Sequence, residues 1–314
     1  MATLVLTHAD VSRYLNALYL LQDLREAFRT DALARTVSAQ TTRAVLHTGG
    51  TVIAGFPGSL PGVPAFSVRI TNRFPAQEPP ERDFIQLFDL LTGELLAVME
   101  AGHLVPMRAA VVGALAADVL ARADAKRVAL IGAGKDAAIH LKSLRLVRSL
   151  QHVRIFDPDM ARAAALSFRL YSTLSLPSHA ASSVAEAVED ADIVITTGSA
   201  REGALLPEMV RPGTHVTLGT DEPSRTTPPP GLLERAAFFC DSRQSALATG
   251  AIPEGAIHAE LGEVIAGTRG GRSSPDQVTV FAELGQPFQD LAAAWQVYEA
   301  AKQDDLTQRV ELGA

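Results

Sequence analysis

The sequence predicts an α/β protein with two domains, a doubly wound parallel sheet and an α+β domain. Between residues 119 and 290, short and almost wholly apolar runs alternate with helical patterns. Such runs are typical of parallel strands buried on both faces, and the alternation implies right-handed βαβ units. Residues 1–118 and 291–314 instead combine helical patterns with short strands and turns, which favours α+β.

The first element is expected to be a single capped helix. Thr7 and Asp10 offer side-chain oxygens for an N-cap, and apolar residues recur at helical spacing from Val11 to Phe28. The following segment changes to short strands, expected at 51–55, 65–70 and 84–89. Residues 55–64 contain three glycines and three prolines, which predicts a loop, and Leu91–Glu94 resembles a hairpin turn.

An alanine-rich helix is expected over 105–122, as the connection to the second domain. In that domain the pattern predicts a helix over 160–170, and a last helix over 288–302 that can pack back on the first domain. The strands expected there are apolar runs at 127–131, 153–156, 192–197, 215–219, 237–241 and 277–281.

A glycine turn carries the strongest functional signal. The strand at 127–131 ends in Gly132, Gly134 and Ala137, spaced G-x-G-x-x-A, before a helical pattern. The two glycines permit a sharp turn and close approach of the backbone to a pyrophosphate, and the alanine permits close helix packing. The phosphates then meet unpaired N–H groups at a helix N-terminus. A glycine turn of purely structural purpose is the alternative.

The same pattern indicates which dinucleotide is bound. Asp157 ends the next strand, 25 residues beyond Gly132, where its carboxylate can accept hydrogen bonds from an adenosine ribose and repel a 2′-phosphate. NAD(H) is therefore favoured over NADP(H), although Arg154 lies close enough to complicate that choice. The candidate cofactor-binding residues in the turn and at the strand ends are Gly132, Ala133, Gly134, Lys135, Asp136, Ala137, Asp157, Thr196, Thr197 and Gly219.

Composition excludes several other classes of protein. The net charge of −7 argues against binding to nucleic acid backbones, and no apolar run is long enough for a membrane helix. The N-terminus does not resemble a signal peptide, and Cys240 is the single cysteine, so we expect a cytoplasmic enzyme without disulfides. The eight histidines are scattered and predict no metal site.

Taken together, six ordered segments resemble the ornithine cyclodeaminase/mu-crystallin family. They are Leu104–Ala110, the G-A-G-x-x-A turn, Arg211–Val216, Gly219–Arg225, Ala259–Val264 and Ser274–Phe281, the last followed by Gly285 and Gln289–Leu291. The resemblance implies a homodimer that binds NAD(H) or NADP(H) and acts on a small amino or imino acid. Residues 1–118 and 291–314 would then form the substrate-binding and dimerisation domain, and 119–290 the Rossmann dinucleotide-binding domain.

The resemblance also implies roles for individual residues. Arg108 matches the family's carboxylate-binding arginine, and Arg43 matches a second arginine near the substrate; an arginine's planar fork suits a carboxylate. Asp221 matches the catalytic aspartate and would lie beside the substrate nitrogen. Arg225 and Gly285 match positions near the cofactor. Without the motif, each arginine would be a surface or helix-end residue and Asp221 a turn residue.

Three departures bear on the substrate. Arg69 replaces the lysine of ornithine cyclodeaminases at a catalytic and substrate-binding position, and a guanidinium does not readily lose a proton. Ala54 stands, by count from Arg43, where those enzymes carry a glutamate suited to a distal amine. Glu283 departs from the family's F-K-S-x-G segment. We therefore expect hydride transfer at the α-carbon of an amino or imino acid, with a cyclodeaminase or a non-catalytic crystallin-like binding protein as alternatives.

Overall fold

A computed structural model describes residues 2–34, 41–46, 50–197, 205–219, 228–229 and 231–312. The chain divides into two compact units, Met1–Arg108 with Gln286–Ala314, and Ala109–Gly285. The sequence placed these divisions after residues 118 and 290. Helix α3 (Leu104–Leu120) runs through the first division, and a helical pattern alone does not reveal where along it the contacts change.

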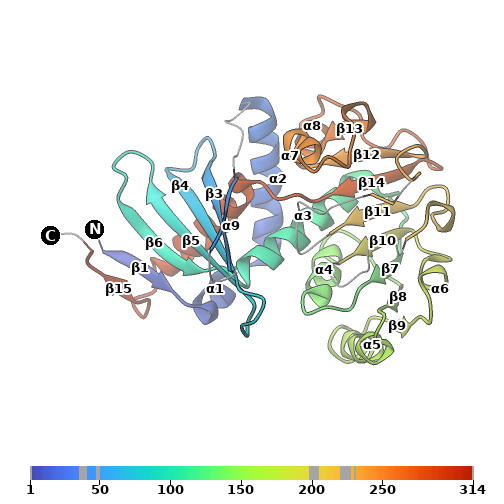
Figure 1. Cartoon of the computed structure of the whole chain (residues 1–314), viewed down its shortest axis with the longest axis horizontal. Helices are drawn as coiled ribbons and strands as arrows, with labels where there is room; N and C mark the ends of the chain where they lie inside the picture. Colours follow the sequence, from blue (N-terminus) through green and yellow to red (C-terminus); the bar gives the residue numbers. More distant parts are fainter. Residues whose placement is uncertain are drawn as a thin grey trace. The chain divides into compact units, whose positions relative to one another are not determined.

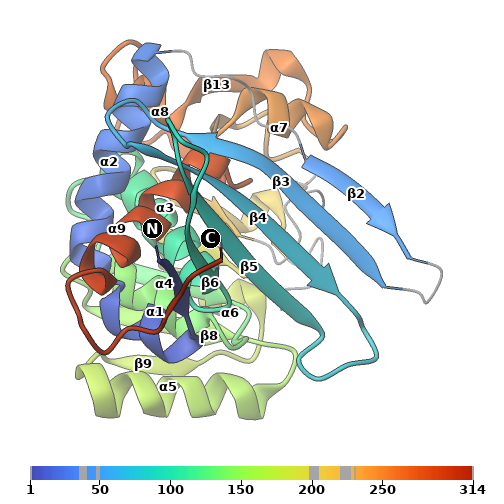
Figure 2. The same cartoon turned by 90° about the vertical axis from the view of Figure 1, so that its left-hand side faces the viewer.

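The first unit contains a seven-stranded sheet in the order β15-β1-β6-β5-β4-β3-β2 (Figures 1 and 2). Neighbouring strands are antiparallel, except that β1 and β6 are parallel. The expected turn at Leu91–Glu94 is confirmed, because it joins β5 to β6 with Gly93 at φ 71°. The strands are β1 (Thr3–Leu6), β2 (Thr41–Val45), β3 (Thr51–Ser59), β4 (Ala65–Arg73), β5 (Glu81–Asp89), β6 (Leu95–Glu100) and β15 (Arg309–Val310).

The expectation of one N-terminal helix is wrong, since the segment forms α1 (His8–Tyr14) and α2 (Ala17–Ala34). Thr7 and Asp10 do form a capping box at α1. The helix ends because Asn16 Oδ1 accepts hydrogen bonds from the backbone N–H groups of Leu18 and Tyr19, at 2.9 and 3.2 Å. Asn16 thus begins a second helix, a competition between side chain and backbone that apolar spacing does not reveal.

The expected loop at residues 55–64 is also partly wrong, because β3 continues to Ser59 through an irregularity between Gly55 and Gly58. A Cβ atom on Gly58 would lie 2.1 Å from the carbonyl oxygen of Pro287, the first residue of α9 (Pro287–Ala301). The glycine is therefore needed for a close approach of strand and helix. Helix α9 packs on β3 and β4 and against α2, as expected for the last helix (Figure 2).

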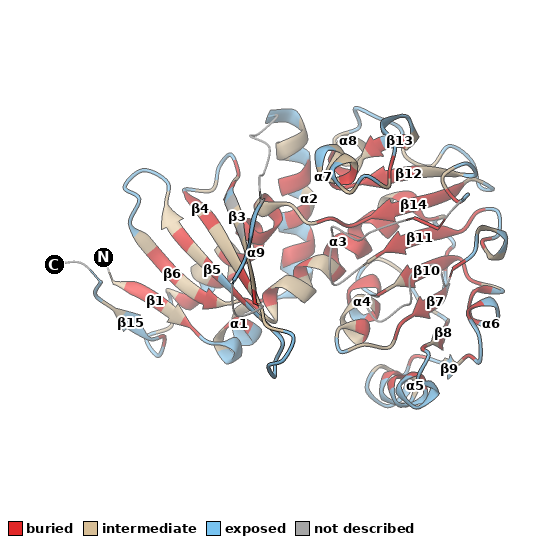
Figure 3. Ribbon diagram, in the orientation of Figure 1, coloured by how far each residue is buried: buried red, intermediate tan, exposed pale blue. Residues whose placement is uncertain are grey.

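The second unit contains an eight-stranded sheet in the order β13-β12-β14-β11-β10-β7-β8-β9, and every pairing in it is parallel. The strand order reverses beside β7, which confirms the expected doubly wound Rossmann fold. Strands β7, β10, β11 and β14 are mostly buried, as Figure 3 shows. The strands are β7 (Arg127–Ile131), β8 (His152–Phe156), β9 (Ser178–Ala180), β10 (Ile193–Thr196), β11 (His215–Leu218), β12 (Ala236–Cys240), β13 (Ile257–Glu260) and β14 (Val278–Ala282).

The other α-helices described in this unit connect its strands. They are α4 (Ala137–Leu144), α5 (Met160–Leu174), α6 (Val184–Val188), α7 (Arg243–Ala248) and α8 (Leu261–Ile265). Within the described ranges, no helix has the length and apolar character needed to cross a membrane.

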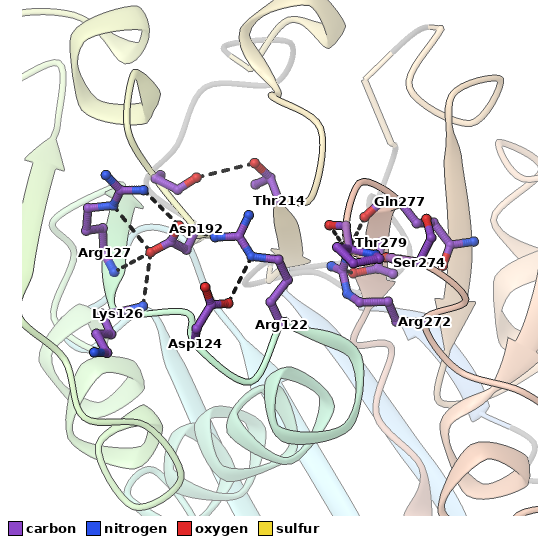
Figure 4. Close-up of polar contacts among 12 residues, drawn as sticks. Arg122, Asp124, Lys126, Arg127, Asp192, Thr214, Arg272, Ser274, Gln277 and Thr279 are labelled. Atoms are coloured by element: carbon purple, nitrogen blue, oxygen red, sulfur yellow. Dashed lines mark hydrogen bonds and ion pairs between the residues drawn. The ribbon is translucent and has the colours of Figure 1, made fainter.

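The amino ends of the parallel strands are held by a polar network around Asp192 (Figure 4). Its carboxylate accepts from the guanidinium groups of Arg122 and Arg127, at 2.7 and 3.1 Å, and from the backbone N–H groups of Lys126 and Arg127. Burial alone would raise the pKa of Asp192, but these hydrogen bonds and the Arg127 charge outweigh it and lower the pKa. The network fixes the edge of the sheet opposite the glycine turn.

Candidate functional site

The glycine turn has the geometry that a dinucleotide requires. Gly132 has φ 102°, a conformation that favours glycine, and its N–H donates to the carbonyl of Phe156 at 2.7 Å. Ala137 is fully buried at the start of α4, where a larger side chain would push the helix from the sheet. Lys135 is exposed, and Asp136 occupies the N-cap position of α4. The turn therefore meets the backbone and packing conditions for binding a pyrophosphate.

Asp157 anchors this turn, a role that the sequence did not reveal. One carboxylate oxygen accepts from the backbone N–H of Ala133 at 2.7 Å. The other accepts from the N–H of Asp159 at 2.9 Å and from the guanidinium of Arg162 at 2.8 Å. Burial would raise the pKa of Asp157, but these donors outweigh it and lower the pKa, so the carboxylate stays ionised. The ribose contact expected of Asp157 would share a carboxylate that already accepts from at least three donors among the described residues.

The residues at the ends of β10 and β11 lie beside the glycine turn. The N–H of Thr197 donates to the carbonyl of Ile131 at 2.9 Å, and its hydroxyl donates to the carbonyl of Gly132 at 3.1 Å. Gly219 donates to the carbonyl of Thr196 at 3.1 Å, and a Cβ atom on Gly219 would lie 2.8 Å from that oxygen. Thr196, Thr197 and Gly219 thus lie together with the glycine turn at the carboxyl edge of the sheet, where open α/β sheets bind ligands.

Gly285 lies at the end of the second unit and has φ 78°. Its N–H donates to a carboxylate oxygen of Asp241 at 2.7 Å, and the N–H of Leu284 donates to the same carboxylate. Asp241 is buried directly after β12. Sequence reasoning included Asp241 in a strand but assigned it no role, although an acid at the end of an apolar strand was a usable signal.

A small cavity lies on one side of this sheet, lined by Gly113 and Ala114 of α3 and by His140, Ile195 and Thr217. Burial lowers the pKa of His140 to about 4, so its imidazole is neutral at physiological pH. The His140 ring lies near Gly219, with Cε1 3.9 Å from the position of a Cβ atom there. The cavity near the carboxyl ends of β10 and β11 is thus lined by small and uncharged side chains.

The first unit brings together two of the arginines that the sequence singled out. Arg108 is buried in α3, its Nε donates to Asp290 Oδ1 at 3.0 Å, and its Nη1 donates to Gln289 Oε1 at 2.9 Å. Arg69 of β4 lies against the other oxygen of the same carboxylate, with its Nη1 3.7 Å from Asp290 Oδ2. Asp290 therefore joins the two arginines.

A second acid holds Arg69 from the other side. The Nε and Nη2 atoms of Arg69 donate to Asp83 Oδ1 at 3.0 and 2.8 Å, and the hydroxyl of Thr71 donates to the same oxygen. Asp83, Gln289 and Asp290 were not among the predicted site residues. For Asp290 the Q-D-L segment was a signal, whereas Asp83 is recognisable only once β4 and β5 pair, with Thr71 opposite Asp83.

Arg43 lies on the exposed strand β2. It pairs with Ile53, which pairs with Thr71, which in turn pairs with Asp83. By this register, Arg43 lies on the same face of the sheet as Thr71 and Asp83. It is separated from β4 by one strand. The structure thus joins Arg69 and Arg108 through Asp290 and places Arg43 in the same row of cross-strand neighbours as Asp83.

Two predicted site residues, Asp221 and Arg225, lie outside the described residues. Ala54, at the position that count assigned to the cyclodeaminase glutamate, pairs with Thr42 and Ile70 in the sheet. Glu283 is buried directly after β14, and its N–H donates to the carbonyl of Leu218 at 3.3 Å.

Comparison with known proteins identifies the family. The model of the ornithine cyclodeaminase/mu-crystallin family matches residues 1–305. The chain belongs to this family. Ketimine reductase mu-crystallin of Mus musculus is 32% identical over 258 residues, which cover 78% of this chain and 80% of the relative.

Two solved structures are similar to this chain over nearly its whole length. Δ1-pyrroline-2-carboxylate reductase of Thermococcus litoralis, in complex with NADH and L-proline, has a TM-score of 0.88 at 25% identity and covers 98% of this chain and 100% of its own. An archaeal alanine dehydrogenase dimer with bound NAD has a TM-score of 0.90 at 27% identity and covers 100% of both chains. The expected class of enzyme, a nicotinamide-dependent oxidoreductase of amino or imino acids, is thereby confirmed, and NAD(H) binding is supported.

Proposed function

We propose that this protein transfers hydride reversibly between NAD(H) and the α-carbon of a small amino or imino acid. The observation that carries the proposal is the pair Arg69 and Arg108 on one buried carboxylate, within a chain that also has an intact dinucleotide turn. Guanidinium groups held by acids present fixed donors, and fixed donors suit a carboxylate. Arg43, on the same face of the sheet as Asp83, would complete the carboxylate site.

The cofactor would supply or accept the hydride at the α-carbon when it is bound. Asp221, assigned by its motif, would lie beside the substrate nitrogen, stabilise its positive charge and exchange its proton. The residues that would hold the cofactor are those of the glycine turn and the ends of β10 and β11, with Arg225 and Gly285 assigned by motif. A glycine with positive φ and an adjoining helix N-terminus fit a pyrophosphate.

We further propose that NAD(H) is preferred over NADP(H). Asp157 is ionised at the end of β8, and Asp159 follows it as the N-cap of α5. Arg162 is paired with both acids, at 2.8 and 3.5 Å, so the three side chains together carry a net negative charge that would repel a 2′-phosphate. The dimeric state of the archaeal relative supports a homodimer here, assembled through the first unit. A cytoplasmic location is part of the same proposal.

Arg69 disfavours the cyclodeaminase alternative. An arginine does not readily lose a proton, so Arg69, which pairs with Asp83 and Asp290, is a poor acid–base substitute for the lysine of ornithine cyclodeaminases. Release of ammonia would then need another acid–base group. We therefore favour hydride transfer without cyclisation over a cyclodeaminase reaction.

Oxidation of NADH, followed by absorbance, tests the proposal with a panel of cyclic imino acids and of 2-oxo acids supplied with amines. We expect turnover with at least one imino acid and a higher kcat/KM with NADH than with NADPH. Asp221→Ala should lower kcat by a factor of about 10² to 10⁴ and leave NADH binding unchanged. Arg108→Met should raise the substrate KM at least tenfold, about 1.4 kcal/mol.

Arg82→Met provides the matched control, because Arg82 is an exposed arginine of the same sheet and is not joined to Asp290. Its kinetic constants should stay close to those of the wild type. Tight NADH binding without turnover on the whole panel would refute the enzymatic proposal and support a crystallin-like binding protein.

A further inference from the structure

Within the described residues, the arginine cluster of the first unit pairs two cations with two anions. Arg69 and Arg108 are its cations, and Asp83 and Asp290 are its anions. The side chains of Arg108, Asp83 and Asp290 are 4%, 8% and 9% exposed, and that of Arg69 is 24% exposed. Water therefore screens these charges weakly, and the sum of charges around any ligand matters more than it would at the surface.

Among these four groups, Asp290 has a special position. Its two carboxylate oxygens lie against different arginines, 3.0 Å from Arg108 Nε and 3.7 Å from Arg69 Nη1. Asp83 contacts Arg69 and Thr71. Asp290 thus compensates the charge of both arginines at once.

The position of Asp290 is set by backbone contacts rather than by these ion pairs alone. It lies in the first turn of α9, whose first carbonyl is packed against Gly58 of β3. Gln289, fully buried beside it, also holds Arg108. The helix that carries Asp290 is therefore held closely against the sheet.

A buried cluster that holds an acid against both of its arginines discriminates between ligands by their charge. A 2-oxo acid brings a carboxylate without compensation, so it would meet the repulsion of Asp290 as well as the attraction of the arginines. A protonated imino acid or an amino acid brings a carboxylate and a cationic nitrogen together and adds no net charge. Arg43, which would complete the carboxylate site, is exposed, so water screens its charge more than it screens the charges of the buried groups.

We infer that Asp290 is a specificity-determining residue that makes the site select zwitterionic amino and iminium acids over anions of the same shape. The inference rests on the proposed function, in which Arg69 and Arg108 bind the substrate carboxylate. Since the protonated C=N group is the form that accepts hydride readily, this selection admits the reactive form of an imine and excludes the corresponding 2-oxo acid.

Ligand binding to the NADH-loaded protein, measured by calorimetry, tests the inference with two probes of similar size. L-proline is a zwitterion, and pyrrole-2-carboxylate is an anion with an uncharged ring nitrogen. In Asp290→Asn the amide oxygen can still accept from Arg108, but the negative charge is gone. We expect the affinity for pyrrole-2-carboxylate to rise about tenfold, and that for L-proline to change less than threefold.

Glu81→Gln is the matched control, because it also removes one negative charge. Glu81 forms a partly exposed ion pair with Arg73 on β5 and β4, the strands that carry Asp83 and Arg69. Its selectivity should equal that of the wild type, and Asp290→Glu, which keeps the charge, should retain wild-type selectivity within threefold. Asp290→Ser is a second uncharged variant for the case that Asp290→Asn does not fold.

Equal shifts for both probes, no shift, or no binding of either probe would overturn the inference. The same shift in Glu81→Gln would also overturn it, because the effect would then not belong to Asp290. The proposed function fails separately, if no imine supports oxidation of NADH. If the wild type turns over an imine but Asp290→Asn has unchanged selectivity, only the role of Asp290 is contradicted and the proposed function stands.

Discussion

Stability should depend on pH through His215, a fully buried histidine of β11. Its Nδ1 lies 2.9 Å from Thr279 Oγ1, and its Nε2 lies 3.2 Å from Thr217 Oγ1. The hydroxyl of Thr279 already donates to the carbonyl of Leu120 and accepts from Arg272. We therefore assign the proton of the neutral ring to Nδ1, which donates to Thr279.

Burial is the main reason that the imidazolium is unfavourable here, and the nearby charges of Arg272 and Arg148 add to it, lowering the pKa of His215 to about 3. The pKa in the unfolded chain is about 6.5. Between these values the unfolded state binds more protons than the folded state, so the contribution of His215 is fully present above about pH 6.5 and is lost as the pH falls.

At pH 5 the loss amounts to 1.5 pH units at about 1.4 kcal/mol each, or about 2 kcal/mol. Burial of His140, whose pKa is lowered to about 4, adds a similar loss. Urea unfolding at pH 7.5 and at pH 5 measures the free energy of unfolding of the wild type and of His215→Asn. The variant should be less stable at pH 7.5, but its loss on going to pH 5 should be smaller by about 2 kcal/mol.

The interval from pH 7 to pH 8 is an internal control, because the two proteins should show the same pH dependence there. An identical loss of stability in both proteins between pH 7.5 and pH 5 would refute the reasoning. It would mean that the folded protein admits a proton at His215 without penalty.

Further predictions concern backbone contacts within each of the two units. Gly219→Ala should weaken NADH binding at least tenfold, since its Cβ would lie 2.8 Å from the carbonyl of Thr196, whereas Gly255→Ala, with nothing within 4 Å of the added atom, should bind NADH as the wild type does. Asp241→Ala should lower the free energy of unfolding by about 1–3 kcal/mol, because the buried N–H of Leu284 and the partly buried N–H of Gly285 lose a carboxylate acceptor. An unchanged urea midpoint would contradict this. Gly58→Ala should lower the melting temperature and raise the substrate KM together, because its Cβ would lie 2.1 Å from the first carbonyl of α9 and so displace Asp290; a change in only one of these quantities would contradict that link.

Local patterns were sufficient for the elements whose signal lies in neighbouring residues. The glycine turn is one such case, because the spacing of Gly132, Gly134 and Ala137 states what the backbone must do at each position. The parallel strands are another, because burial on both faces requires apolar residues throughout. The first helix shows the limit, since the hydrogen bonds of Asn16 end it despite continuous apolar spacing.

What the sequence by itself determined is thus the fold class, the dinucleotide turn, the family and the class of chemistry, because each depends on residue types at short or ordered spacings. The tertiary structure alone decided what the charged residues contact. Asp290 and Arg108 are 182 residues apart, and only the packing of α9 on the sheet brings that acid between two arginines. Likewise, Asp157 is a plausible ribose ligand in the sequence and an anchor of the glycine turn in the fold. The partners of a side chain are set by which residues are close in space, and a local pattern that predicts a strand or a helix does not specify those residues.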